Sequence, residues 1–209
     1  KHGQTRAPPH MAAPPKVGST YAKVLDESSN LANDLDEYSL VILDNPKLSD
    51  KYEKKLLKFI DGGGQLLVFP PVREGKKLLK FIELEEVETA GKNNVYDVAS
   101  WDELQGPLAD TLQGESLPVN KLLIKSRQLN KETGQVLASY SDGQPFLSRF
   151  GLGKGAVYYC SSSIAQSWSD LYKGPILLPM LSRLVQEGSK KFSSIKFESC
   201  KADDLLEQM

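Results

Sequence analysis

The sequence predicts an α/β fold with a mainly parallel sheet and an added antiparallel hairpin layer, and two stretches carry this prediction. Residues 38–69 read as strand, helix and strand: "YSLVILDNP", "LSDKYEKKLLKFIDGGG" and "QLLVF". Short continuous apolar runs are typical of parallel strands that are buried on both faces. Residues 135–162 contain three strand-like runs, separated by Asp142-Gly143 and by a second, glycine-rich turn. We therefore expect a right-handed β-α-β unit followed by an antiparallel hairpin.

Three segments have apolar residues at helical spacing: 19–35, 49–61 and 168–188. Ser49 is the expected N-cap of the second helix, and Gly62 is its expected C-terminal stop. In the third helix Asp170 lies near the start and Pro175 suits the first turn. Pro179 lies further in, so we expect it to kink that helix.

The middle of the chain is less regular. We expect a short helix running into a strand at 76–88, a loop with a helical turn at 100–113, and a strand at 120–129. The pattern does not indicate how these pieces pair with one another.

Both ends of the chain differ in composition from its centre. Residues 1–18 are rich in proline and contain His-Met, a common cloning junction, so we expect a linker or a tail introduced by cloning. Residues 19–188 form the predicted α/β domain. Residues 189–209 are expected to be a C-terminal strand and tail, or the start of a further domain, because 190–199 alternate like a strand.

Charge and composition exclude several classes of function. The chain has 26 basic and 27 acidic residues, interspersed, so we expect no binding to nucleic acid. No apolar run approaches the roughly 20 residues of a membrane-spanning helix, so we expect no direct membrane insertion by this fragment. The two cysteines, Cys160 and Cys200, do not form a disulfide framework and leave the redox compartment open.

Two stretches resemble a known family. "DLDEYSLVILDNPKLSDKYEKKLLKFIDGGGQLLVFPP" (34–71) and "GKGAVYYCSSSIAQSWSDLYKGPILLPMLSRLV" (153–185) are similar to the class I glutamine-amidotransferase-like core. That core occurs in trehalose-utilisation-type domains and in bacterial membrane proteins of the aerotolerance-regulator (BatA) group. The resemblance covers about half of the chain. It implies a flavodoxin-like three-layer fold and a parent protein anchored in the membrane, and we expect this domain on the periplasmic side rather than the cytoplasmic one.

The catalytic residues of true amidotransferases are absent from the matching positions. The resemblance places a nucleophilic cysteine at the turn after strand 65–69, where this chain has Phe69-Pro70-Pro71-Val72. Proline has no N–H group to donate to an oxyanion. The only histidines, His2 and His10, lie in the predicted linker, so the fold cannot supply a Cys–His or Ser–His pair. We therefore expect no catalytic residues, no metal site and no cofactor.

Cys160 has two interpretations. It lies near the end of an apolar strand and is followed by three serines. Open α/β sheets bind ligands at this end of their strands, so Cys160 could be a nucleophile. The alternative, which we favour, is a small buried apolar residue.

A residual pocket is expected at the carboxyl edge of the sheet. Its candidate residues are Asp44, Asn45, Pro70, Ser161, Trp168 and Asp170. The alternative for "SWSD" (167–170) is structural: Ser169 or Asp170 caps a helix while Trp168 packs as a lid. The Asp-Asn-Pro sequence at 44–46 is also ordinary turn chemistry.

Three functions are compatible with these observations. The leading hypothesis is a non-catalytic, amidotransferase-like interaction or scaffold module with a protein partner in the cell envelope. The second is a domain that binds a small molecule, such as a carbohydrate, at the carboxyl edge, which rests on fold analogy. The third is a hydrolase or transferase that uses Cys160 or a carboxylate.

Overall fold

The computed structural model describes residues 35–71, 77–92, 94–111, 114–131 and 134–192. The chain divides into two units, Lys1–Asn33 and Asp34–Met209, and all that follows concerns the second. The predicted linker 1–18, all but the last residue of the predicted helix 19–35, and Cys200 lie outside the described residues. Among the described residues, no helix has both the length and the apolar character needed to cross a membrane.

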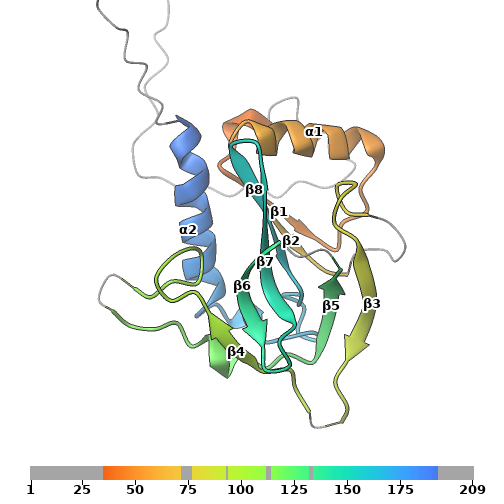
Figure 1. The fold of residues 1–209 in the computed structure, drawn as a ribbon, viewed down its shortest axis with the longest axis vertical. Helices are drawn as coiled ribbons and strands as arrows, with labels where there is room; N and C mark the ends of the chain where they lie inside the picture. Colours follow the sequence, from red (N-terminus) through yellow and green to blue (C-terminus); the bar gives the residue numbers. More distant parts are fainter. Residues whose placement is uncertain (1–34, 72–76, 93, 112–113, 132–133, 193–209) are drawn as a thin grey trace, which may run out of the picture. The chain divides into compact units, whose positions relative to one another are not determined.

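The main sheet has six strands in the order β1-β2-β8-β7-β6-β4 (Figure 1). The strands are β1 (Leu40–Asp44), β2 (Gln65–Phe69), β4 (Val98–Trp101), β6 (Gln135–Tyr140), β7 (Pro145–Leu152) and β8 (Gly155–Cys160). The pairs β1–β2 and β2–β8 are parallel, whereas β8–β7, β7–β6 and β6–β4 are antiparallel. The expected α/β class and strands are confirmed. The sheet is mixed, however, because β8 pairs with β2 on one side and β7 on the other, so the hairpin strands extend the same sheet and form no separate layer.

A second, two-stranded sheet consists of β3 (Leu84–Thr89) and β5 (Ser126–Asn130), which pair antiparallel. The helices are α1 (Asp50–Asp61) and α2 (Leu177–Ser189), with short 3-10 segments η1 (Leu35–Glu37), η2 (Val119–Lys121), η3 (Leu171–Lys173) and η4 (Lys190–Phe192). All five residues of β5 are buried although four of them are polar. This strand is central to the site described below.

Helix α1 begins after Ser49 and ends in a glycine turn. Ser49 occupies the N-cap position as predicted, although its side chain makes no capping hydrogen bond. Gly62 is the C-cap, and the left-handed residue is Gly63, with φ of 107°. The Gly63 N–H donates to Ile60 O and the Gly64 N–H donates to Phe59 O. This double closure is a Schellman motif, and it turns the chain directly into β2.

The two helices pack on opposite faces of the parallel strands. Leu67 and Phe69 of β2 belong to the same buried cluster as Met180 and Leu184 of α2. Alternate residues of a strand point to opposite faces, so Leu66 and Val68 face the other side, where α1 contacts β2 and β8. The parallel strands therefore carry one helix on each face.

Three local predictions are wrong. Residues 77–82 form a tight turn instead of a helix, because Leu78 bridges to Ile82 and the intervening Leu79 and Lys80 have positive φ. Residues 102–111 contain no helical turn, and Val98–Trp101 before them is a strand. In each case pairing with distant strands overrides local helix propensity.

The helix expected at 168–188 is divided. Asp170 precedes the short η3, Gly174 adopts a left-handed φ of 97°, and α2 begins only at Leu177. Pro179 therefore lies in the first turn of α2, where a missing N–H is tolerated, which corrects the expected kink. At the other end, η4 occupies the first residues of the strand expected at 190–199; the remainder of that segment lies outside the described residues.

Candidate functional site

Four predicted site residues lie at one edge of the sheet. Asp44 ends β1 and is paired in register with Phe69, the last residue of β2; Val68 is paired with Tyr159 of β8. Asn45, Pro70 and Ser161 are therefore the first residues after three adjacent parallel strands. Their placement at the carboxyl edge agrees with the prediction.

The first two strand ends have ordinary turn chemistry. Asn45 has a left-handed φ of 48°, which asparagine tolerates, and its N–H donates to Phe69 O at 3.2 Å. Asp44 is exposed, and its partial burial raises the pKa of its carboxyl group. Pro70 is buried and joined to Pro71 by a cis peptide bond. The turn after β2 offers neither a nucleophile nor a proline N–H.

Cys160, at the end of β8, is a core residue. Its side chain is 0% exposed and belongs to the main buried cluster. Burial raises the pKa of the thiol to about 12. Because the thiolate is the nucleophilic form, this environment disfavours reaction near neutral pH.

We therefore expect iodoacetamide to modify Cys160 slowly in the folded protein and rapidly once urea unfolds it. The rate is measured by peptide mass spectrometry across pH, with Cys200 in the same sample as a reference thiol. A fast reaction in the absence of urea, with an apparent pKa well below the ~8.5 of a free thiol, would contradict this interpretation and support the third hypothesis.

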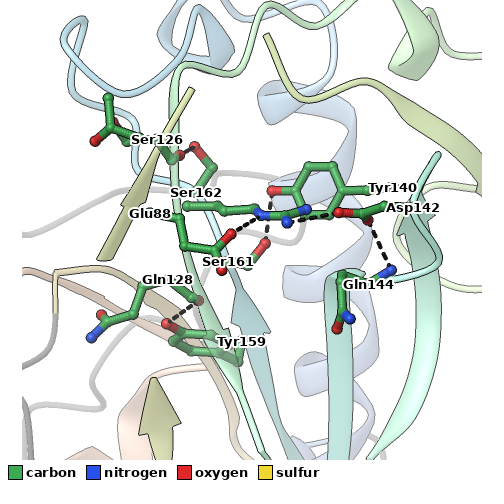
Figure 2. Close-up of polar contacts among 11 residues, drawn as sticks. Glu88, Ser126, Gln128, Tyr140, Asp142, Gln144, Tyr159, Ser161 and Ser162 are labelled. Carbon is green, nitrogen blue, oxygen red and sulfur yellow. Dashed lines mark hydrogen bonds and ion pairs between the residues drawn. The ribbon is translucent and has the colours of Figure 1, made fainter. Parts of the chain in front are cut away.

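The three serines after Cys160 are buried, and each side chain has a partner. The Ser161 hydroxyl is 2.8 Å from the Tyr140 hydroxyl, and the Ser162 hydroxyl donates to Ser126 O at 2.9 Å. The Ser163 hydroxyl accepts the Ala165 N–H at 3.1 Å. The serines thus tie the chain after β8 to its neighbours, and they are not directed into an open pocket (Figure 2).

Strand β5 covers the end of β8. The Gln128 N–H donates to Ser161 O at 2.7 Å, and the Tyr159 hydroxyl donates to Gln128 O at 2.9 Å (Figure 2). Further along, Trp168 O accepts the N–H groups of Lys125 and Ser126. The second sheet therefore occupies the position beyond β8 where an open α/β sheet would bind its ligand.

Asp170 and Trp168 serve the same closure. The Asp170 carboxylate accepts the Leu123 N–H at 2.9 Å and pairs with Lys173 at 3.2 Å. The Ser169 hydroxyl accepts the Leu171 N–H and donates to Ser163 O. Segment 168–170 is thus bound to segment 123–126, which agrees with the structural alternative for "SWSD". Its recorded polar contacts do not run toward Asp44, Asn45 or Pro70.

Sequence reasoning missed Arg127, the central charged residue of this closure. Its side chain is 7% exposed, and it forms ion pairs of 2.7 Å with Glu88 of β3 and with Asp142 of the β6–β7 turn. The guanidinium carbon lies 4.1 Å from the ring centre of Tyr96 and 4.9 Å from that of Tyr140. Figure 2 shows the Glu88 and Asp142 carboxylates approaching each other from the two sheets. Arg127 therefore fastens the second sheet to the main sheet.

The electrostatics of this cluster favour the charged arginine. Burial disfavours the guanidinium charge, but the hydrogen bonds with Asp142 and Glu88 outweigh it, so the pKa of Arg127 is raised. The hydrogen bond from Arg127 is also the main reason that the pKa of Asp142 is lowered. One nitrogen, Nη1, is buried without a hydrogen-bond partner among the described residues. The two tyrosine rings account for it, since a guanidinium binds aromatic faces without conventional acceptors.

The lowered pKa of Asp142 predicts a loss of stability in acid. A carboxyl whose pKa is lower in the folded state stabilises the protein fully above its ordinary value of 3.8 and loses this contribution as pH falls through the folded pKa. The urea midpoint of the wild type should therefore exceed that of Asp142→Asn most clearly at pH 5–7, and the difference should shrink below pH 3.8. A difference that stays constant down to the lowest pH would show that the Asp142 charge contributes nothing.

A hollow of about 380 Å³ lies at the opposite edge of the sheet. It is lined by Asp36, Lys58, Phe59, Asp61, Gly62, Lys191 and Phe192. The Lys191 ammonium lies 4.6 Å from the Phe59 ring centre, and burial lowers the pKa of this lysine. Among the described residues, no group of three or more His, Cys, Asp or Glu side chains could hold a metal ion.

Comparison with known proteins shows a likeness of fold alone. No family model matches the chain, and no curated protein does. A β-galactosidase from Bacillus circulans sp. alkalophilus is 20% identical with a TM-score of 0.52, over 74% of this chain and 23% of the enzyme. A cold-adapted β-galactosidase from Rahnella sp. R3 is 17% identical with a TM-score of 0.52, over 69% of this chain and 22% of the enzyme. The chain spans about a quarter of these enzymes, so it is similar in fold to one segment of them.

Proposed function

We propose that this chain is a non-catalytic interaction module with a flavodoxin-like, glutamine-amidotransferase-like core. The observation that carries the proposal is the closure of β8 by β5, in which Gln128 and Ser161 occupy the edge where a ligand would lie. The turn after β2 adds support, since Pro70 and Pro71 replace a nucleophile there. The burial of Cys160 removes the remaining candidate thiol from solvent.

The likeness to β-galactosidases does not point to hydrolysis by this chain. Glycosidases generally need two carboxyl groups that flank one bond. At the carboxyl edge Asp44 is exposed, but Asp170 is engaged with Leu123 and Lys173. The alignment also covers only 23% of the first enzyme, and fold alone does not carry its activity to this chain.

The surface that we assign to a protein partner consists of Leu123, Tyr172 and Leu178. These side chains are exposed, and their segments are bonded to one another: Leu123 to Asp170, just before η3, and the Leu178 N–H to Gly174 O, just after it. Lys121 and Lys125 are exposed on either side of Leu123. We expect a partner with an apolar contact surface and acidic residues at its rim.

We further propose that the parent protein is anchored in the bacterial cell envelope and that this module lies on its periplasmic side. The support for this placement is the resemblance of residues 34–71 and 153–185 to the aerotolerance-regulator group. Fusion of a redox-sensitive reporter to the parent protein in cells tests it. A cytoplasmic signal would contradict the placement and leave the interaction proposal standing.

Site-specific crosslinking tests the interaction proposal. Tyr172→p-benzoylphenylalanine in the full-length parent protein should give a discrete crosslinked species in cells upon irradiation. Leu178→Lys should abolish that species, because a lysine places a charge within the apolar surface. Leu104→Lys is the matched control: Leu104 is almost fully exposed and lies in the loop after β4. Equal crosslinking in both lysine variants would overturn the assigned surface.

A ligand and substrate panel tests the non-catalytic part. We expect no turnover of ester, amide or glycoside substrates and no change in melting temperature with sugars and nucleotides. Turnover that is lost in Cys160→Ala would establish an enzyme instead. A rise in melting temperature that is lost in Asp44→Ala would establish the small-molecule hypothesis.

A further inference from the structure

The outer edge of β1 carries unpaired backbone groups. The Gln65 N–H donates to Ser39 O at 3.0 Å, and the Asn45 N–H donates to Phe69 O at 3.2 Å, so the odd-numbered residues here face β2. In a parallel ladder the N–H and C=O of one residue point to the same side. Leu40, Ile42 and Asp44 therefore direct their N–H and C=O groups away from β2. Among the described residues, no strand pairs with β1 on that side.

This edge lacks the features by which edge strands usually avoid pairing. Those features are proline, lysine, inward-pointing charges and β-bulges. The sequence of β1 is "LVILD", and its pairing with β2 is regular over all five residues. Ile42 in its centre is 43% exposed. The edge of β1 is thus suited to bind a further strand.

The described chain ends close to the beginning of β1. Gly188, in the last turn of α2, lies so near the strand that a Cβ at this position would be 2.0 Å from Ser39 O. The short η4 follows, with Lys191 over the Phe59 ring and Phe192 exposed. A chain that continues from Phe192 starts at the amino-terminal end of β1, and from there it can run parallel to that strand.

The handedness of the crossover is also correct. The chain passes from β1 to β2 through α1 on one face of the sheet, and it leaves β8 through α2 on the opposite face. A strand beyond β1 lies in the reverse direction along the sheet. Reversing both the face and the direction preserves the hand, so both crossovers have the right-handed form that about 98% of parallel connections adopt.

Residues 193–199, which lie outside the described residues, have a suitable sequence. In "SSIKFES" the apolar Ile195 and Phe197 alternate with Lys196 and Glu198. Seven extended residues span roughly 23 Å, which exceeds the roughly 17 Å of a five-residue strand such as β1. We propose that residues 193–199 add to β1 as a seventh, parallel strand of the main sheet. The C-terminal segment then completes this domain instead of beginning another.

Amide hydrogen exchange measured by NMR tests the proposal. In the full chain the Ile42 amide should be protected, as is the Leu43 amide, which faces β2 and serves as the internal reference. A chain that ends at Phe192 should exchange Ile42 about tenfold faster, the factor that corresponds to one backbone hydrogen bond, with Leu43 unchanged. Should the shortened chain fail to fold, the double variant Ile195→Lys, Phe197→Lys gives the same readout, with Lys196→Ala as its control.

Three outcomes would overturn the proposal. The first is equal exchange of Ile42 in the full and the shortened chain. The second is loss of its protection when residues 1–33 are deleted instead, which would assign the added strand to the other end. The third is protection that depends on protein concentration, which would show that a second copy of the chain pairs with β1.

Discussion

Replacing Arg127 with alanine is expected to lower the free energy of unfolding by about 3 kcal/mol, the lower end of the range for breaking a buried ion pair. The lower end applies because the partners that remain, Glu88 and Asp142, have side chains that are 43% and 45% exposed and can be hydrated again. The loss includes the packing between the rings of Tyr96 and Tyr140. Urea unfolding at pH 7 gives the value directly.

Arg127→Lys separates charge from shape. Lysine keeps the charge but cannot bond two carboxylates in one plane or lie flat against two rings. We therefore expect a loss between those of the wild type and the alanine variant. The long apolar Arg127→Met fills the same space without a charge, and recovery of most of the stability by this variant would show that packing outweighs the ion pairs. Wild-type stability in the alanine variant would contradict the role assigned to Arg127.

The same variant should act locally before it acts globally. The contacts of Arg127 join β3 and β5 to the turn after β6, so their loss should increase hydrogen exchange in the second sheet more than in β2. If the exposed end of β8 then bound small molecules, closure by β5 would be the reason that the wild type does not. This connects the stability prediction to the proposed function.

The parts of the fold that could be predicted are those whose signal is local. Strands β1 and β2 are apolar runs bounded by turn residues, and α1 has one apolar face between a serine and a glycine stop. The hairpin strands alternate around Asp142-Gly143. Each pattern lies within about ten residues of its element, so the sequence contains all that is needed.

The parts that could not be predicted depend on distant partners. Residues 77–82 have helical spacing but turn back on themselves, so that β3 can start at Leu84 and pair with β5. Placement of Asp44, Asn45, Pro70 and Ser161 at one edge followed from the rule for parallel strands. The closure of that edge did not, because Arg127 and its partners are brought together only by the two sheets.

Gly188→Ala is expected to destabilise the protein by about 2 kcal/mol, near the middle of the range for overpacking. Helix propensity alone predicts the opposite sign, a gain of about 1 kcal/mol on replacing glycine within a helix. Packing decides the outcome, because the added Cβ would meet Ser39 O at 2.0 Å and Ser39 C at 2.7 Å. These are backbone atoms at the start of β1, and they cannot rotate away as a flexible side chain would.

Gln186→Ala, at an exposed position two residues earlier, provides the control for propensity and should leave the urea midpoint within error of the wild type. If Gly188→Ala instead raised the midpoint, α2 would be free to move away from Ser39. The close contact that brings the end of α2 to the start of β1 would then be absent in solution. Residues 193–199 would no longer be held beside the edge of β1, so this single variant also bears on the seventh strand.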